Sequence, residues 1–432
     1  MIAPTSNLTN FVNTRTPLAR AILVLVVILT LVFAWFSVKW QLGNMLAENT
    51  SPVKPEAETV AEYAIWLAPD DPLSNWILAS SKSRSFFSKT EQSLESFKNA
   101  VRLAPYDFRW WLELGSALEE NNEIELAESA LKKAVSLAPS YAYPRWRLGN
   151  FYLRRGDVEK AIAEFQQASK HNSVYRQQIF SVLWDYFDQN PEILMKTVED
   201  NPSAMADLAV FFATKSRPNE SLQVWQKLTP DERNRRGPIA KVLAQGLFEK
   251  KHFRSSLEFS KEIGLDAEAD IGKMQNGGFE SPIDRESKAY FDWKVVPVEK
   301  TDVRLDATQK HSGRRSLRIQ FNGYSGIQYY HVYQTVVIQS EKKYRLVFWH
   351  RAEKLKSAGP PLIEILNAGD YKLIKSSKPI EDSAEWQKQE VEFITPEGAE
   401  AIVIRVGRVV CGSQCPLFGT IWLDDFELTE IR

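Results

Sequence analysis

The acidic, thiol and imidazole side chains of this sequence form no recognisable catalytic motif. The chain contains no G-x-S-x-G nucleophile elbow, no H-E-x-x-H zinc motif, no phosphate-binding G-x-x-x-x-G-K-S/T and no dinucleotide-binding G-x-G-x-x-G. Its five histidines include no pair at the helical spacing that binds zinc. Paired carboxylates can cleave glycosides wherever a fold brings them together, so the sequence leaves that chemistry open. The elements described below leave no room for a separate catalytic domain, and we predict that the protein is not an enzyme.

Three carboxylates and two cysteines remain as candidates for metal or redox chemistry. Glu280 and the adjacent Asp424 and Asp425 supply hard oxygen ligands, but three acids fall short of the six to eight ligands that Ca²⁺ usually takes. The alternative is that they are surface carboxylates at strand ends. Cys411 and Cys415 are the only two cysteines. They form a disulfide, two free thiols or half of a metal site.

The overall composition excludes several classes of protein. The 432 residues carry a formal net charge of −1, which argues against a nucleic-acid binder, because such binding depends on many contacts between basic side chains and phosphates. Two cysteines cannot build a disulfide framework or a four-cysteine zinc site. The length corresponds to two or three domains. Aromatic residues make up 12% of the chain, so rings must pack or stack in at least one of these domains.

One segment near the N-terminus is apolar enough to cross a membrane. Residues 21–38 (AILVLVVILTLVFAWFSV) contain no charge, and at about 1.5 Å per residue they nearly fill a hydrocarbon core of ~30 Å. Trp35, Lys39 and Trp40 suit the membrane interface. A cleaved signal peptide is the alternative, but its apolar region is shorter and ends in small residues. We predict an uncleaved transmembrane anchor over residues 21–40.

The charges on either side of this segment predict its orientation. Residues 1–20 contain Arg15 and Arg20 and no acid, whereas four glutamates lie within residues 41–62. The positive-inside bias places the tail, residues 1–20, in the cytoplasm. We therefore expect a single-pass protein of a bacterial inner membrane, with a polar linker at residues 41–55 and the rest of the chain in the periplasm. That oxidising compartment favours a disulfide between the two cysteines.

The next part of the chain repeats at intervals of 34 residues. AVRLAPYDF at residues 100–108 recurs as AVSLAPSYA at residues 134–142. The positions that match a known pattern are Trp111, Leu114, Gly115, Leu118, Ala127, Leu131, Ala134 and Pro139, followed by Leu148, Gly149, Tyr152, Ala161, Phe165 and Ala168. This pattern resembles the tetratricopeptide repeat family. Helical spacing continues more weakly beyond residue 175, and we expect one all-α, tetratricopeptide-like solenoid over residues 56–265.

The resemblance implies a concave groove, lined by the first helix of each pair, that holds a peptide or a partner protein. The side chains expected to face this groove are Arg109, Glu119, Trp146, Asn150 and Arg154. The alternative is that the array is a spacer whose groove binds nothing specific. Repeat arrays are rarely enzymes, because each unit contacts only its neighbours and no closed pocket forms.

From about residue 271 the sequence changes to short alternating runs separated by turn residues. The runs at 317–321, 332–338, 344–350, 361–366, 389–395, 401–407 and 420–428 are typical of strands. The order of the phrases NGGFE, HSGRRSLRIQF, YRLVFWHRA and WLDDFEL resembles the jelly-roll carbohydrate-binding modules attached to many polysaccharide-degrading enzymes. We expect an all-β jelly-roll sandwich over residues 271–432. The resemblance also implies a structural calcium held by Glu280, Asp424 and Asp425.

Alternation along two of the expected strands suggests a surface for sugar rings. Tyr329, His331 and Tyr333 share one face of their run, and Trp349 and Arg351 share a face of the next. Aromatic rings can stack on sugars while polar groups bind hydroxyls. The alternative is that these rings cap the core or pack against the helical array.

Together these features predict a membrane-anchored, extracytoplasmic scaffold. Its helical repeats hold a protein partner, and its sandwich binds envelope polysaccharide, in the setting of polysaccharide synthesis or export. The alternative is a purely structural assembly protein whose sandwich binds protein rather than glycan.

Overall fold

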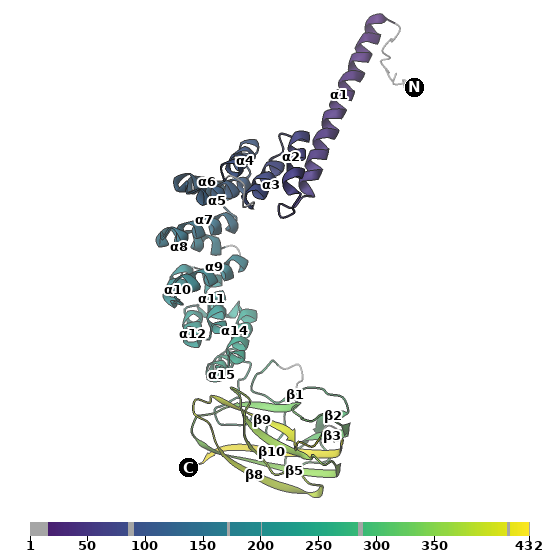
Figure 1. Ribbon diagram of the computed structural model, residues 1–432. Coiled ribbons are helices and arrows are strands. Elements are labelled where there is room, and N and C mark those ends of the chain that lie inside the picture. The colour runs from purple at the N-terminus through teal and green to yellow at the C-terminus, as the bar shows by residue number, and fades with distance from the viewer. Residues whose placement is uncertain are drawn as a thin grey trace, which may run out of the picture. The chain divides into compact units, whose positions relative to one another are not determined.

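The computed structural model describes residues 16–84, 90–170, 173–199, 201–283, 288–412 and 415–431. The chain divides into two compact units, residues 1–179 and residues 180–432, which are described separately here (Figure 1). Most of the expected cytoplasmic tail, including Arg15, lies outside the described residues.

The first unit begins with one long apolar helix, α1 (Pro17–Glu48). Thr16 caps its N-terminus by accepting a hydrogen bond from the Ala19 backbone N–H, and Pro17 supplies a backbone angle suited to the first turn. The apolar part of α1 is fully exposed, and by length and composition it could cross a membrane. The expectation of a linker from residue 41 is wrong, because the helix continues to Glu48. Its last turns are held by packing, since a Cβ on Gly43 would lie 2.6 Å from the Ala68 Cβ.

The rest of the first unit is a series of short helices that pack in pairs. Their bounds are α2 (Ala57–Leu67), α3 (Pro72–Arg84), α4 (Thr90–Leu103), α5 (Phe108–Glu120), α6 (Ile124–Leu137), α7 (Ala142–Arg154) and α8 (Val158–Ser169), and α9 (Ser173–Tyr186) crosses into the second unit. Glycines permit the close approach within pairs: a Cβ on Gly115 would lie 2.8 Å from Leu131, and one on Gly149 would lie 2.6 Å from Phe165. The matched small and large residues of the repeat pattern are therefore contact pairs.

The second unit opens with further helices. They are α10 (Pro191–Val198), α11 (Pro202–Thr214), α12 (Pro218–Gln226), α13 (Pro230–Asn234), α14 (Gly237–Glu249) and α15 (Phe253–Glu262). Trp225 and Phe259, which lie 34 residues apart in sequence, meet edge to face with ring centroids 5.6 Å apart. The weaker repeat signal beyond residue 175 therefore also marks packed helices.

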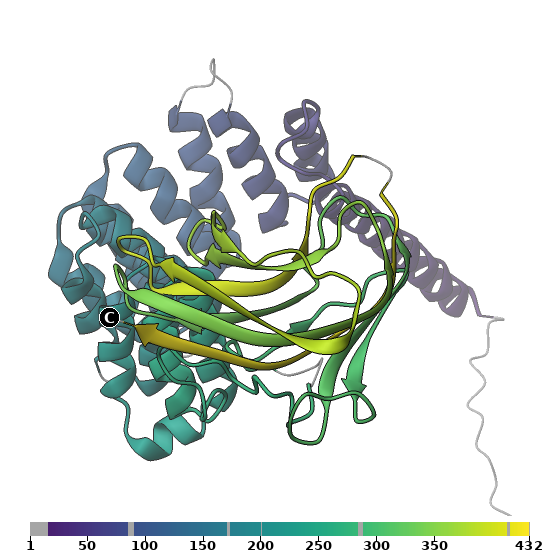
Figure 2. The ribbon, with the colours of Figure 1, turned by 90° about the horizontal axis from the view of Figure 1, so that it is seen from below.

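The β-sandwich follows the helices and consists of two antiparallel five-stranded sheets. Its strands are β1 (Lys294–Val295), β2 (Thr301–Asp306), β3 (Ser316–Tyr324), β4 (Val332–Val337), β5 (Lys343–Lys356), β6 (Pro361–Asn367), β7 (Leu373–Ser376), β8 (Ser383–Ile394), β9 (Ala401–Arg408) and β10 (Leu417–Ile431). Sheet A has the order β1-β4-β9-β6-β7, and sheet B has the order β2-β3-β10-β5-β8. Figure 2 shows the sandwich from below.

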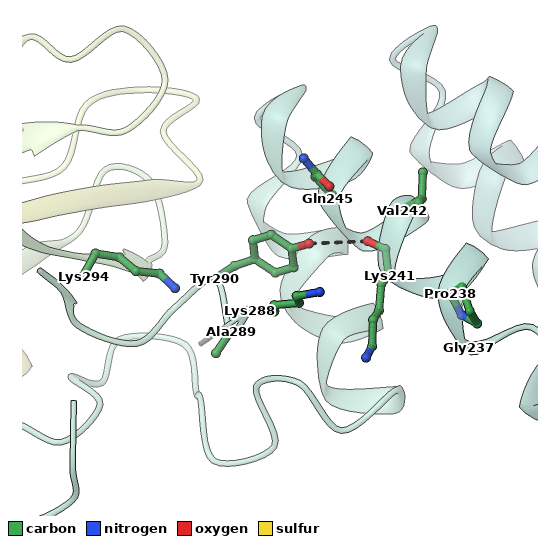
Figure 3. A pocket seen from close by; sticks show the side chains of 9 residues that line it. All are labelled: Gly237, Pro238, Lys241, Val242, Gln245, Lys288, Ala289, Tyr290 and Lys294. Carbon is green, nitrogen blue, oxygen red and sulfur yellow. Dashed lines mark hydrogen bonds between the residues drawn. The ribbon is translucent and has the colours of Figure 1, made fainter. Parts of the chain in front are cut away.

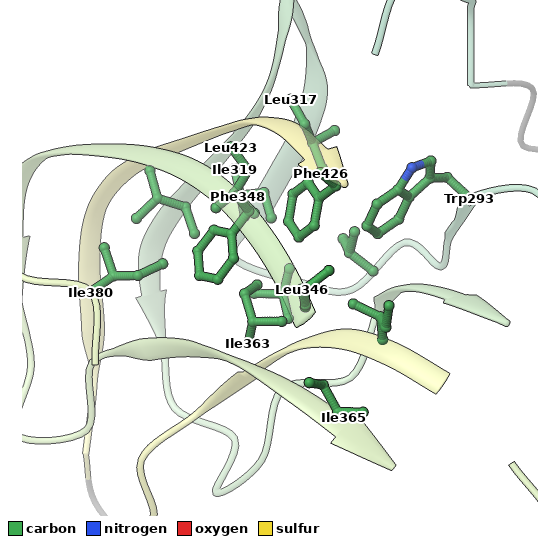
Figure 4. Close-up of a cluster of buried hydrophobic side chains, with 14 of the residues drawn as sticks. Trp293, Leu317, Ile319, Leu346, Phe348, Ile363, Ile365, Ile380, Leu423 and Phe426 are labelled. Atoms are coloured by element: carbon green, nitrogen blue, oxygen red, sulfur yellow. The ribbon is translucent and has the colours of Figure 1, made fainter. Parts of the chain in front are cut away.

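The space between the two sheets is filled by inward-facing side chains of alternating residues. On β5, Tyr344, Leu346 and Phe348 are buried, whereas the residues between them are only partly covered. The Phe348 and Phe426 rings stack with centroids 5.2 Å apart, and Trp293 closes one end of the cluster (Figure 4). A strand period of two thus fixes which side chains of each strand face outward.

Part of the outer face of sheet A is covered by the last helical pair. Phe253 and Leu257 of α15 form a buried cluster with Phe291 and with residues of sheet A, namely Val337, Leu366, Ala401 and Val403. Both oxygens of the buried Asp266 carboxylate accept backbone N–H groups, from Tyr290 at 3.1 Å and from Phe291 at 3.0 Å. In Figure 1, β5 and β8 of sheet B lie on the side of the sandwich away from α15. The outer face of sheet B is therefore not the face that the helices cover.

The buried imidazole of His350 should make the sandwich sensitive to acid. Burial lowers the pKa of His350 to about 4, and its Nε2 accepts a hydrogen bond from the Gln389 side chain at 3.0 Å. In the unfolded chain His350 is protonated near pH 6.5, whereas in the folded chain it stays neutral until about pH 4. The contribution of His350 to the free energy of unfolding is therefore complete above pH 6.5 and is lost as the pH falls toward 4. The shift corresponds to roughly 3 kcal/mol.

We expect His350→Leu to reduce this loss when urea unfolding of the detergent-solubilised chain is compared at pH 7 and pH 4.5. Leu346→Ala is the matched control, because it removes buried side-chain volume from the same strand without removing a titrating group. It should lower the free energy of unfolding by about 2–5 kcal/mol at both pH values. An unchanged pH dependence in His350→Leu would contradict the assignment.

Candidate functional site

Three aromatic rings meet on the first helices of neighbouring repeats in the first unit. Tyr143 and Trp146 lie on α7, Tyr175 lies on α9, and the three ring centroids are 6.0–6.1 Å apart. All three side chains are half-buried. The guanidinium of Arg147 lies 5.6 Å from the Tyr143 ring and donates to its hydroxyl at 2.7 Å. We call Tyr143, Trp146 and Tyr175 the repeat cluster.

Of the repeat cluster, the sequence analysis identified only Trp146. Tyr143 follows Arg109 by one repeat length, so the same positional rule that selected Arg109 could have found it. Tyr175 lies beyond the clear repeat pattern and gave no comparable signal.

The other expected groove residues bind neighbouring groups of the chain itself. Arg109 pairs with Asp107, and hydrogen bonds from Arg109 hold the pKa of that carboxyl below its usual range. Arg154 donates to both carboxylate oxygens of Glu119, at 2.8 and 2.7 Å. Asn150 donates to the Trp146 backbone carbonyl. Exposed ion pairs of this kind contribute about 0–1 kcal/mol, so a partner can replace them at small cost.

The five side chains expected to form a glycan surface do not lie together. Tyr329 is 1% exposed in the sandwich core, and His331 is 9% exposed. Tyr333 packs against the cluster that Phe253 and Leu257 of α15 form with sheet A. The alternation counted from Tyr329 is wrong because β4 begins only at Val332. Trp349 and Arg351 face outward on β5, which belongs to the other sheet.

The rings and charges on the outer face of sheet B are already occupied by contacts within the chain. His311 stacks on Trp349 with ring centroids 3.8 Å apart, and the Arg351 guanidinium lies over the Trp422 ring at 5.8 Å. Arg351 also pairs with Glu353 at 2.6 Å. Further pairs on this sheet are Arg318 with Asp302, Arg345 with Glu392, and Lys388 with Glu390. This face is therefore a poor platform for stacking on a ligand.

Next to the part of sheet A that α15 covers, four partly buried polar side chains lie in register across four strands. Lys294 pairs in register with Tyr333, Tyr333 with Arg405, and Arg405 with Glu364. Arg405 donates to Glu364 at 2.7 Å, and both side chains are about one fifth exposed. Burial raises the pKa of the Tyr333 hydroxyl, which therefore stays protonated and able to donate. We call Lys294, Tyr333, Arg405 and Glu364 the sheet A row.

A cavity of about 750 Å³ adjoins the sheet A row at Lys294. It is lined by Gly237, Pro238, Lys241, Val242, Gln245, Lys288, Ala289, Tyr290 and Lys294. Figure 3 shows Lys241 on the α14 side and Lys294 on the strand side, with Lys288 and Tyr290 between them. Among the described residues, the lining of this cavity includes three lysines and no carboxylate. We call this the lysine cavity.

Two of these lysines form no ion pair with a carboxylate in the described part of the chain. No described carboxylate forms an ion pair with Lys241 or Lys288, although the second unit is rich in acids elsewhere. The Tyr290 ring stacks on Phe248 with centroids 5.0 Å apart, and its hydroxyl donates to the Lys241 carbonyl at 3.4 Å. Within the described ranges, the cavity therefore combines a fixed ring with two lysines that form no ion pair, an arrangement that suits an anionic ligand.

The three carboxylates expected to bind calcium all contact one loop of the sandwich, residues 311–315. Glu280 accepts backbone N–H groups from Arg314 and Arg315, and these bonds lower its pKa. Asp424 is fully buried, and its carboxylate accepts the backbone N–H groups of His311 at 2.9 Å and of Ser312 at 3.3 Å. Within the described ranges, no three carboxylate, imidazole or thiol side chains are grouped so that they could hold a metal ion. Calcium binding therefore stays a prediction of the sequence.

Cys411 and Cys415 are joined by a disulfide in the structure. Arg408, which is 3% exposed, lies against this bridge and donates to the carbonyls of Gly326, Gly359 and Cys415. Burial lowers the pKa of its guanidinium. Arg408 thus connects the loops that contain Gly326, Gly359 and Cys415, and the disulfide holds the last of these loops closed.

Comparison with known proteins identifies the repeats in the chain. The family model of the tetratricopeptide repeat matches residues 82–142 and 125–173. No curated protein matches the chain.

Among solved structures, the chain is similar to one described as "CBM4 structure and function", with 18% identity over 37% of this chain and 99% of that chain and a TM-score of 0.28. It is similar to the CBM22-1 xylan-binding domain of Xyn10C from Paenibacillus barcinonensis, with 11% identity over 38% of this chain and 98% of that chain and a TM-score of 0.26. It is also similar to MamA from Desulfovibrio magneticus RS-1, with 16% identity over 44% of this chain and 92% of that chain and a TM-score of 0.27. Matches at this level are no evidence of what the chain binds.

The expected fold class is confirmed by the helical pairs and by the two stacked antiparallel sheets. Residues 82–173 match the tetratricopeptide repeat model.

Proposed function

We propose that this protein is a membrane-anchored scaffold that holds a protein partner in its helical repeats and a polysaccharide on its β-sandwich. The repeat cluster is the observation that carries the proposal, because three half-buried rings on neighbouring first helices offer the kind of aromatic anchor on which protein interfaces depend. The anchor is α1, with its N-terminus in the cytoplasm and the rest of the chain in the periplasm. We further propose that it acts in the synthesis or export of envelope polysaccharide.

Substitution in the repeat cluster should weaken partner binding without unfolding the repeats. We expect Trp146→Ala to cost about 2 kcal/mol of binding free energy, which corresponds to a roughly thirtyfold weaker Kd. The measurement is quantitative mass spectrometry of proteins captured by the detergent-solubilised chain from solubilised envelopes. Captured proteins are then titrated against the wild type and the variant.

The matched control for the repeat cluster is Leu126→Ser, which replaces an apolar side chain that is 55% exposed on α6, the second helix of its pair. It should leave capture unchanged, and circular dichroism should show the same helix content in both variants. Proteins that bind equally to wild type, control and Trp146→Ala would identify the array as a spacer.

The sheet A row and the lysine cavity are the surface on which we propose that the polysaccharide binds. The row offers a half-buried tyrosine hydroxyl and a paired arginine and glutamate, all of which can bind sugar hydroxyls. The adjoining cavity adds the ammonium groups of Lys241 and Lys288, which favour sugars that carry carboxylates. The covered rings on sheet B make that face the weaker candidate.

Affinity electrophoresis in a neutral detergent tests this surface. We expect the full chain to be retarded in gels that contain polygalacturonate or alginate more than in gels that contain neutral xylan or β-glucan. Lys241→Gln with Lys288→Gln should remove most of this preference, and added salt should weaken it.

Trp349→Ala is the control for the sheet, because it removes an outward ring from sheet B while leaving sheet A intact. It should migrate as the wild type does. Retardation that Trp349→Ala abolishes and the double lysine variant preserves would place the glycan on sheet B. No retardation in any of the gels would favour the alternative, in which the sandwich binds protein.

A further inference from the structure

We infer that the end of α2 and the turn that follows it lie in the lipid headgroup layer beside α1, so that the first helical pair rests on the bilayer. This inference depends on the proposed role of α1 as a membrane anchor. It concerns a surface made by residues 63–70, which has no part in the repeat groove or in the sandwich.

The chain reverses direction after α1 and returns toward the apolar segment. Ala57, Ala61 and Ala64 of α2 are fully or almost fully buried, and they pack in one cluster with Ala47 near the end of α1. Further along α2, a Cβ on Gly43 would lie 2.9 Å from the Ala64 carbonyl oxygen. Small residues thus bring the two backbones together, and each turn of α2 lies beside an earlier turn of α1.

The far end of α2 reaches the level at which the apolar run of α1 ends. The Lys39 ammonium lies 4.5 Å from the centre of the Trp66 ring. Beyond it, Leu67, Pro69 and Asp70 line one cavity of about 630 Å³ together with Phe33, Phe36 and Trp40 of α1. Because α1 rises about 1.5 Å per residue, Phe33 lies roughly 10 Å nearer the middle of the apolar run than Trp40. The turn after α2 therefore lies beside the last two turns of the span.

The side chains at this level are large, aromatic and exposed. Trp66 is 67% exposed, Tyr63 is 62% exposed and Trp40 is 49% exposed. Tyr63 and Trp66 are three residues apart and therefore share a face of α2. Tryptophan and tyrosine are enriched at membrane interfaces, where an apolar ring and a polar N–H or O–H can both be accommodated.

The charges nearby fix the depth at which these rings can lie. Lys39, Glu62 and Asp70 are close to the same surface, and their charged groups must remain hydrated. The headgroup layer satisfies both requirements, whereas the hydrocarbon core would bury the carboxylates. Continuity with the exposed apolar run of α1 favours lipid over a protein partner as the occupant of this surface.

Site-directed spin labelling in liposomes of phosphatidylcholine and phosphatidylglycerol tests the inference. Since Cys411 and Cys415 form a disulfide, a single introduced cysteine is the thiol available for labelling. Labels at Trp66→Cys and Tyr63→Cys are compared with a hydrocarbon reference, Leu29→Cys on α1, and an aqueous reference, Leu126→Cys on α6. The readout is the relative accessibility of each label to oxygen and to a soluble nickel chelate.

We expect the labels at residues 63 and 66 to give a ratio of oxygen to nickel accessibility between those of the two references. The inference is overturned if both labels match the residue 126 reference while the residue 29 label reports hydrocarbon. Immobilised labels without oxygen access, or dipolar broadening between copies, would indicate a protein contact and would also overturn it. An aqueous result at residue 29 is a different outcome, because it would refute the anchor itself.

Discussion

The packing of α14 and α15 on sheet A is the interaction on which the available surfaces of the second unit depend. Phe253 and Leu257 enter a cluster with Val337 and Val403, and each such side chain contributes about 1.5–3 kcal/mol when it is withdrawn from water. The Asp266 carboxylate also accepts hydrogen bonds from the backbone N–H groups of Tyr290 and Phe291. These contacts cover one end of the sheet and fix the segment that enters the sandwich.

The same packing creates the lysine cavity. Tyr290 is held between the Asp266 carboxylate and the Phe248 ring, and its position sets the wall that faces α14. Lys294 then lies where the cavity meets the sheet A row. The site proposed for glycan is thus shared between a helix and a sheet, and neither element would form it alone. On sheet B, outward charges pair among its own strands.

The sequence could predict those features that depend on local periodicity. The 34-residue repeat identified Gly115 and Leu131 as positions of the pattern, and in the structure they lie against each other because close helix pairing requires a small residue opposite a large one. Alternation correctly placed Trp349 and Arg351 on one face of β5. The glycan surface could not be predicted, since Tyr329 precedes the first residue of β4 and the two runs belong to different sheets. The lysine cavity was missed because Lys241 and Lys288 meet only after the helices pack on the sheet. The start of the linker was predicted too early, because the role of Gly43 and Ala47 as contact residues is seen only once α2 packs against them.

The close approach of α1 and α2 at Gly43 has a mechanical consequence. Two helices joined by small residues at backbone distance cannot swing freely about a hinge between residues 41 and 55. A tilt of α1 is therefore transmitted directly to the first helical pairs. If α1 spans a bilayer as proposed, a change in hydrocarbon thickness changes the tilt of α1, and the start of the array turns with it. The tilt of α1 is then coupled to the orientation of the first repeats. Replacing Gly43 by a larger residue would separate α1 from α2 and weaken this coupling.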